Sequence, residues 1–280
     1  MLKDEIEIRE QARRLNLGVE HVVRDVIQAR LIGAIFAASA GELVLKGGLA
    51  MRTFHRSHRL TKDMDLQCDP EVSQARVASI IRKALGQALD TGFLKQVSIT
   101  APKQTDTVQR FKIAGIVGSS HINMTVEVSR RGLPPPEELV TTKVVDLAGQ
   151  ARSVYSYSAS AIAASKVVAL AAPNRLAARD LYDLDLLITM EVNPPIALLA
   201  RMGKKGIEEA IANLWDKLEL LTWDHAVETL REFLPRPEAA RLTESSWEER
   251  RLRTGETVER WLREAMQMIE ERELQPAMSM

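Results

Sequence analysis

Cysteine, aromatic residues and long apolar runs are scarce in this sequence, and each scarcity excludes a class of protein. The 280 residues include one cysteine, Cys68, which excludes a disulfide framework and a four-cysteine zinc site. Aromatic residues make up 4% of the chain, which argues against stacking platforms for single-stranded nucleic acid. No apolar run approaches the roughly 20 residues of a membrane span, and the charged N-terminus lacks a signal-peptide core. We therefore expect a cytoplasmic protein with no membrane association.

The sequence also carries no formal net charge. Lys+Arg and Asp+Glu both number 38, so the formal net charge is zero. A balanced charge excludes a globally basic nucleic-acid coat, but it leaves room for a local basic patch.

The pattern of apolar residues divides the chain into a mixed α/β part and a helical part. Helical spacing predicts two N-terminal helices and another helix over 71–89. Strands are expected at 42–46, 63–68, 96–101, 108–117, 121–129 and 154–158. We therefore expect an α+β protein, with a mixed β-sheet core flanked by helices over 1–155 and a helical C-terminal domain over 156–280.

A diglycine turn follows the first of these strands. Gly47 and Gly48 come directly before a short helix predicted over 49–57. Glycine lets backbone N–H groups approach a ligand closely, and a helix N-terminus favours anions. The turn is typical of a phosphate cradle, although diglycine turns are also common where no ligand binds.

Two aspartates share one face of the next strand. Side chains alternate along a strand, so Asp63 and Asp65 point the same way, with Cα atoms about 6.6 Å apart. Carboxylates so placed can converge on a metal pair separated by about 3.5–4 Å. Glu127 lies on the polar face of the strand at 121–129, and it completes a three-carboxylate metal site if that strand pairs with 63–68. The alternative is a set of ordinary solvated carboxylates.

Charged residues also lie on an otherwise apolar helical face near 160–188. Lys166 has apolar residues one turn away on both sides, and Arg179, Asp180 and Asp183 fall within an arc of about 100° on the next helix. Charged groups among leucines must be paired or bound to a ligand. Arg179 and Asp183 are spaced to pair with each other. In the functional alternative, Lys166 and Arg179 contact substrate phosphates while the aspartates orient them or serve the nucleophile.

Together these stretches resemble the AbiEii-type nucleotidyltransferase toxins, a Type IV toxin–antitoxin family of the polymerase-β-like nucleotidyltransferase superfamily. The run KGGLAMRTFHRSHRLTKDMDL is similar to the family's first motif: Lys-Gly-Gly-Thr-Ala-Leu-Arg, a basic loop, then Ser-x-Asp-x-Asp-Leu. The run SKVVALAAPNRLAARDLYDLDLL is similar to its second motif: a lysine, spaced arginines, then Arg-Asp-x-x-Asp. The resemblance covers about residues 40–190.

The resemblance implies a nucleotidyltransferase core and a role for each matched residue. A nucleoside triphosphate (NTP) would bind at Lys46, Gly47, Gly48 and Arg179. Mg²⁺ would bind at Asp63 and Asp65, with Glu127 as third carboxylate by the strand argument. The implied catalytic residues are Asp63, Asp65, Lys166, Asp180 and Asp183.

Three positions depart from the family pattern. Leu49 replaces the threonine after the diglycine, Thr61 replaces the serine before the first aspartate, and Leu60 replaces a usual phenylalanine. Loss of the hydroxyl at position 49 removes one expected phosphate contact, which predicts a weaker or different nucleotide preference. The aspartate pair is intact, so the chain is not expected to be a dead enzyme.

The implied reaction is in-line attack of an acceptor hydroxyl on the α-phosphorus of the NTP, with pyrophosphate leaving and two-metal catalysis. Either Glu127 or Asp180 could take the proton of the hydroxyl. The resemblance also implies an acceptor, the 3′ acceptor end of tRNA, and an antitoxin encoded nearby.

A basic run beside the catalytic strand supports a nucleic-acid acceptor. The run comprises Arg52, His55, Arg56, His58, Arg59 and Lys62. A solvated helix face and loop would explain the same residues. Two other functions stay open: the same core could modify a small molecule or a protein, or the chain could be a non-catalytic nucleotide-binding module.

Overall fold

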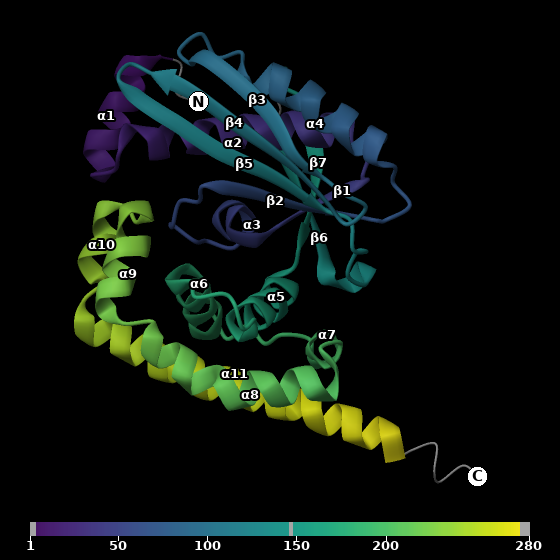
Figure 1. Cartoon of the computed structure of the whole chain (residues 1–280). Helices are drawn as coiled ribbons and strands as arrows, with labels where there is room; N and C mark the ends of the chain where they lie inside the picture. The colour runs from purple at the N-terminus through teal and green to yellow at the C-terminus, as the bar shows by residue number, and fades with distance from the viewer. Residues whose placement is uncertain (1–3, 146–147, 275–280) are drawn as a thin grey trace. The chain divides into compact units, whose positions relative to one another are not determined.

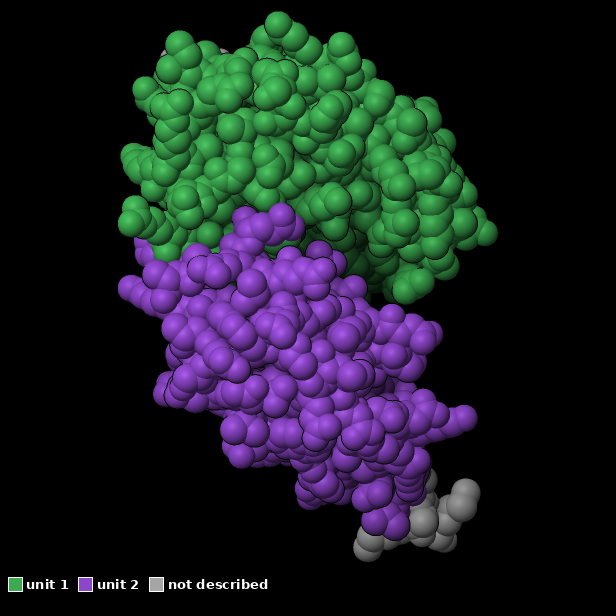
Figure 2. All heavy atoms as spheres, turned by 60° about the vertical axis from the view of Figure 1, so that its left-hand side comes forward, with its two compact units in different colours: residues 1–157, 233–236 green, residues 158–232, 237–280 purple. Residues whose placement is uncertain are grey.

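The computed structural model describes residues 4–145 and 148–274, which form two compact units (Figure 1). Unit 1 comprises residues 1–157 and 233–236, and unit 2 comprises residues 158–232 and 237–280; Figure 2 colours them green and purple. The sequence placed the boundary at 155/156. The structure divides the chain at 157/158, and the chain returns to unit 1 once more at Phe233–Arg236.

Unit 1 begins with the two predicted helices, α1 (Glu5–Leu15) and α2 (Val19–Ala38). The Asp4 side chain accepts a hydrogen bond from the backbone of Glu7 and caps the start of α1. Asn16 adopts a left-handed conformation and ends the same helix. Local capping chemistry therefore fixes both ends of α1.

A seven-stranded mixed sheet forms the centre of unit 1, in the order β3-β4-β5-β2-β1-β7-β6. The strands are β1 (Leu43–Lys46), β2 (Asp63–Cys68), β3 (Lys95–Gln104), β4 (Val108–Val117), β5 (Ser120–Ser129), β6 (Leu139–Val145) and β7 (Ala151–Tyr157). β2 runs parallel to β5 and β1 runs parallel to β7, whereas the other neighbours are antiparallel. The predicted α+β class with a mixed sheet is confirmed.

The pleat of β2 and β5 separates a core face from a polar face. Met64 and Leu66 of β2 and Val126 and Val128 of β5 are fully buried. α2 packs on this side, together with α4 (Gln74–Leu89) (Figure 1). α3 (Gly47–Phe54) contacts β1 and β2. Alternation therefore leaves the side chains of odd-numbered residues in β2, starting with Asp63, on the opposite face.

Residues 233–236 belong to unit 1 through contacts of Phe233. The backbone N–H of Leu60 donates to the carbonyl oxygen of Phe233 at 2.8 Å. The ring of Phe233 meets that of His21 edge to face, with centroids 4.8 Å apart.

The sequence analysis missed β6 and placed the start of β7 three residues late. β6 follows the triple proline and the short helix η1 (Pro136–Glu138), and it is the edge strand of the sheet. No residue of β6 is buried, so it carries no alternation of apolar and polar positions to reveal it.

Unit 2 is helical, as predicted. Its segments are α5 (Ala159–Ala171), α6 (Ala178–Thr189), α7 (Ile196–Ala200), α8 (Gly203–Leu220), α9 (Trp223–Leu230) and α11 (Glu244–Leu274). The short helices η2 (Arg231–Phe233) and α10 (Arg236–Arg241) each have one end in the unit 1 segment Phe233–Arg236. The long helix α11 packs on α6, α7 and α8 and buries Trp247 and Trp261. In the described part of the chain, no helix combines the length and apolar character that crossing a bilayer requires.

Candidate functional site

Four charged residues form a row across the polar face of the sheet in unit 1. Lys46 of β1 is in register with Asp65 of β2, and Asp65 is in register with Glu127 of β5. Glu127 is in turn opposite Arg110 of β4. The expected pairing of the Glu127 strand with 63–68 is therefore confirmed. Two like charges that face each other across strands repel, and here a cation flanks the pair on each side.

Side-chain contacts hold both flanking cations. Arg110 donates from Nε and Nη2 to Oε2 of Glu127, at 2.8 and 2.6 Å. Lys46 Nζ donates to Oε1 of Gln67 at 2.6 Å, and Gln67 Nε2 donates to the carbonyl oxygen of Gly132 at 2.5 Å. Burial lowers the pKa of Lys46, and the nearby carboxylates of Asp65 and Glu127 oppose that shift. Gln67 thus anchors Lys46 beside the carboxylates.

The diglycine turn lies directly against the aspartate strand. α3 begins at Gly47, whose φ of 69° suits glycine. A Cβ atom at Gly47 would lie 2.6 Å from Oδ2 of Asp65, and one at Gly48 would lie 2.9 Å from Nη2 of Arg59. Lys46 at the N-cap provides no side-chain hydrogen bond to the start of α3. A side chain at Gly47 would therefore be strained by its backbone and would crowd the Asp65 carboxylate, and one at Gly48 would crowd the Arg59 guanidinium.

The departures from the family pattern have a local explanation. Leu49 is 3% exposed, so this position contributes an apolar side chain to the core. The hydroxyl of Thr61 lies 3.2 Å from the position that a Cβ atom of Gly48 would take. A hydroxyl is therefore retained next to the diglycine, from the loop before β2.

About half of the basic run is engaged within the protein. Arg52 Nε pairs with Oδ1 of Asp25 at 2.5 Å, and Arg59 is 2% exposed. His55 Nε2 shares a hydrogen bond with the carbonyl oxygen of Tyr157 at 3.0 Å, and burial lowers the pKa of His55. Arg56, His58 and Lys62 are exposed. The run is thus a narrower basic surface than its sequence indicates.

The second set of predicted residues lies in unit 2, where α5 meets α6. Lys166 Nζ lies 2.8 Å from Oδ1 of Asp180 and 2.6 Å from Oδ2 of Asp183. Arg175 Nε lies 2.6 Å from Oδ2 of Asp180. The two aspartates are almost fully buried. Their charges are paired across two helices by Lys166 and, at Asp180, by Arg175.

Opposing effects set the pKa of Asp180. Burial raises the pKa of this carboxyl, but the charges of Lys166 and Arg175 and their hydrogen bonds outweigh burial and lower it to about 2. Asp180 is therefore ionised at neutral pH and has little affinity for a proton.

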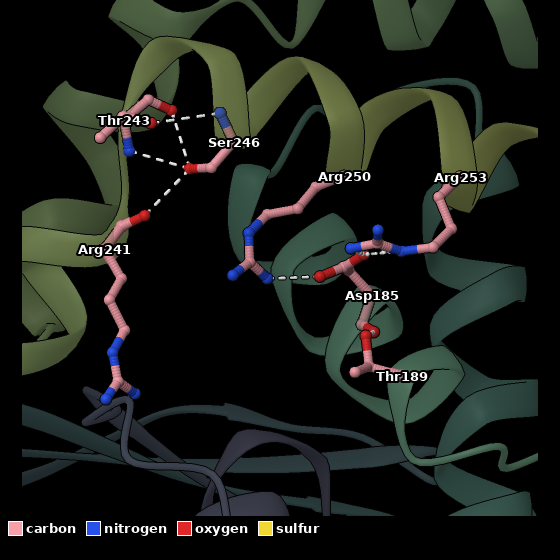
Figure 3. A network of polar contacts seen from close by, with 7 residues as sticks. All are labelled: Asp185, Thr189, Arg241, Thr243, Ser246, Arg250 and Arg253. Carbon is pink, nitrogen blue, oxygen red and sulfur yellow. Dashed lines mark hydrogen bonds and ion pairs between the residues drawn. The ribbon is translucent and has the colours of Figure 1, made fainter.

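A third aspartate of α6 was missed by the sequence analysis. Asp185 Oδ1 accepts from Nε and Nη2 of Arg253 at 2.8 and 2.5 Å, and Oδ2 pairs with Arg250 (Figure 3). Arg250 and Arg253 are three residues apart on the charged helix α11, so they share one helix face. That spacing was the sequence signal for a buried acidic partner.

The start of α11 is fixed by a reciprocal cap (Figure 3). Thr243 N donates to Oγ of Ser246 at 2.9 Å, and Ser246 N donates to Oγ1 of Thr243 at 3.2 Å. This cap and the Asp185 contacts together set the register of α11 in unit 2.

The donor set of β2 suits magnesium. Mg²⁺ prefers hard oxygen ligands and often binds through one or two carboxylates, with substrate phosphates and water completing the octahedron. Asp63 and Asp65 meet that requirement from one face of the strand. Over residues 4–145 and 148–274, no three His, Cys, Asp or Glu side chains gather as a metal-binding group. The metal roles of Asp63, Asp65 and Glu127 stay predictions, as do the catalytic and nucleotide-binding roles in both units.

Comparison with known proteins gives a family and a fold. The family described as Nucleotidyl transferase AbiEii toxin, Type IV TA system, matches residues 30–275. The crystal structure of a candidate nucleotidyltransferase from H. pylori has a TM-score of 0.53 and 19% identity, covering 87% of this chain and 97% of that one. The crystal structure of JHP933 from Helicobacter pylori has a TM-score of 0.47 and 18% identity, covering 93% and 99%. No curated protein matches the chain. The first structure supports the predicted nucleotidyltransferase-like fold.

Proposed function

We propose, since this chain belongs to the AbiEii family of nucleotidyltransferase toxins from Type IV toxin–antitoxin systems, that it transfers a nucleotidyl group from an NTP to the 3′ acceptor end of a tRNA. The membership confirms the resemblance seen in the two sequence motifs, and it indicates an antitoxin partner. The observation that carries the proposal is the contact of Asp65 with Gly47, which puts a carboxylate strand against a diglycine helix N-terminus.

The triphosphate would bind where α3 begins. The first N–H groups of a helix have no partner within it, and the positive end of the helix dipole attracts phosphate. Lys46 adds an ammonium group from the preceding residue, held by Gln67. We assign Lys46, Gly47 and Gly48 to the phosphates. The phosphate contacts that the second motif implies for Lys166 and Arg179 of unit 2 stay predictions.

Asp63 and Asp65 would hold magnesium. When bound, this ion neutralises charge on phosphoryl oxygens and lowers the pKa of a bound hydroxyl. The protein's own contribution is positioning: β2 fixes the two carboxylates on one face, and the Gly47 contact keeps Asp65 next to the phosphate site.

The acceptor hydroxyl must lose a proton during attack. Asp180 is a poor base because its pKa is about 2 and its carboxylate is already paired with Lys166 and Arg175. We therefore assign proton removal to Glu127, on the strand next to Asp65, where both hydrogen bonds from Arg110 go to Oε2 and leave Oε1 to take the proton. Asp180 and Asp183 would act as positioning residues that orient Lys166.

A transfer assay tests this function. The purified protein is incubated with tRNA or total RNA and each of the four α-labelled NTPs, with and without Mg²⁺. We expect magnesium-dependent label on tRNA, lost in Asp63→Asn and Asp65→Asn. Asp69→Asn is the matched control, since Asp69 follows the same strand and an asparagine there can still accept from the backbone of Glu71.

Other outcomes of this assay would replace the proposal. Label on a protein or a small molecule, with none on RNA, would assign a different acceptor to the same core. Nucleotide binding without any magnesium-dependent turnover would identify a non-catalytic binding module.

A further inference from the structure

A polar depression of about 340 Å³ lies beside the carboxylate strand in unit 1. Its volume is at the lower end of the range for ligand sites, about 300–1,000 Å³. The polar side chains that line it are Lys62, Ser98, Thr100, Lys112, Asn123 and Thr125. In the described part of the chain, the lining contains two ammonium groups and no carboxylate.

Strand register connects this depression to Asp63. Thr100 of β3 is opposite Lys112 of β4, Lys112 is opposite Thr125 of β5, and Thr125 is opposite Asp63 of β2. These residues form a second row on the polar face, next to the row that contains Asp65. Neighbouring strands are about 4.8 Å apart, so the Cα atoms of Lys112 and Asp63 are separated by about 10 Å.

The depression and the diglycine turn flank β2 on opposite sides. The turn follows β1, whereas the depression covers β5, β4 and β3, and the sheet order places β2 between β1 and β5. A nucleotidyl transfer needs one substrate on each side of the metal site, and the donor phosphates are assigned to the turn. The strands on the other side are therefore available to the acceptor.

We propose that this depression binds the phosphodiester backbone of the RNA acceptor, adjacent to its reacting end, with Lys62 and Lys112 as the phosphate contacts. The proposal rests on the proposed function, which it extends by naming the acceptor subsite. Lysine binds phosphate as a point charge, and the hydroxyl and amide groups of Ser98, Thr100 and Asn123 suit phosphate oxygens and ribose hydroxyls. An aromatic anchor of the kind that dominates protein interfaces is not among the described lining residues.

The two lysines also explain how a neutral chain would hold RNA. Lys62 is the last residue of the basic run and is exposed, whereas Lys112 comes from β4, much later in the sequence. The fold brings them to one depression, which the basic run alone did not reveal.

The test measures RNA binding and catalysis separately. The test compares three variants, Lys62→Ala, Lys112→Ala and the double variant, with the control Lys83→Ala. Lys83 is an exposed lysine of α4 that lines a different depression. The dissociation constant of fluorescently labelled tRNA is measured without nucleotide at several salt concentrations. The KM values for tRNA and NTP and the kcat are measured with Mg²⁺, and thermal unfolding confirms that each variant is folded.

We expect the double variant to weaken tRNA binding roughly tenfold at physiological salt and to reduce the salt slope by about one for each lysine removed. The KM for tRNA should rise in parallel, while the KM for NTP and the kcat at saturating tRNA stay unchanged. Lys83→Ala should match the wild type.

Two results would overturn the inference. An unchanged tRNA affinity and salt slope in the double variant would show that the depression does not bind the RNA acceptor. A raised KM for NTP with unchanged tRNA binding would assign the depression to the donor. A wild-type protein that binds tRNA without transferring label would refute the proposed function alone, because the binding comparison among the variants would still test the subsite.

Discussion

The two charged regions of the molecule solve the same physical problem in opposite ways. On the sheet of unit 1, Asp65 and Glu127 face each other on neighbouring strands and remain partly exposed. In unit 2, Asp180 and Asp183 are buried and share the ammonium group of Lys166. Burial makes an unpaired charge very costly, so the helical cluster must be neutralised within the protein. The sheet cluster can leave part of that task to a ligand.

The contrast separates two kinds of predicted site residue. Substitution in the helical cluster should mainly change the free energy of unfolding. Substitution in the sheet site should mainly change catalysis, because solvent already screens its charges.

The largest expected effect on stability is in Lys166→Met. This change leaves two buried carboxylates with only part of their compensation, and it should lower the free energy of unfolding by about 3–5 kcal/mol. Urea denaturation followed by circular dichroism measures it. The control Lys205→Met, at a lysine whose side chain is 89% exposed, should stay within about 0.5 kcal/mol of the wild type. Equal effects in the two variants would erase the contrast between the regions.

Gly47→Ala should have the next largest effect and tests the sheet site. The added Cβ meets the Asp65 carboxylate and also forces a left-handed conformation on alanine. We expect a loss of about 2–3 kcal/mol of stability together with transfer activity. Gly92→Ala is the matched control, since Gly92 has φ 76° and no atom within 4 Å of an added Cβ. Gly92→Ala should lower the free energy of unfolding by about 1 kcal/mol, which is the cost of the backbone strain alone. An active Gly47→Ala enzyme would contradict the assigned phosphate site.

Acid titration gives the smallest effect and sharpens the description of unit 2. The folded-state pKa of Asp180 is about 2, below the ordinary 3.8, so its stabilisation is present above about pH 4. It is lost as pH falls from about 4 to about 2, and the shift corresponds to about 2 kcal/mol. Stability against pH is compared for wild type and Asp180→Asn, which should show a flatter acid limb. Parallel curves would mean that Asp180 has an ordinary pKa.

Much of the fold was predictable because it is locally encoded. The span of β2 agrees with the sequence prediction at both ends, since alternation and the turn at Asp69 and Pro70 define it. The N-terminal helices follow from helical spacing, and a left-handed Asn16 ends the first of them. β6 was missed because an exposed edge strand has no apolar periodicity.

The candidate site was predictable in its residues but only partly in its contacts. Alternation and the presumed pairing of strands correctly placed Glu127 next to β2. The partners Arg110, Gln67 and Asp25 could not be foreseen, because each contact joins residues on different elements. The sequence analysis did name the aspartates of α6 as groups that could orient Lys166, and the structure pairs Lys166 with Asp180 and Asp183.

The brief return of the chain to unit 1 at Phe233–Arg236 has a consequence for dissecting this toxin. A fragment cut after Tyr157 would lack Phe233, so the Leu60 amide would lose its acceptor and His21 its aromatic neighbour. A reciprocal C-terminal fragment would carry those four residues without Leu60 and His21, which they contact in unit 1. Expressing the halves separately therefore removes these contacts from the N-terminal half and leaves residues 233–236 without their partners in the C-terminal half. The properties of either fragment would then differ from those of the same residues in the intact chain.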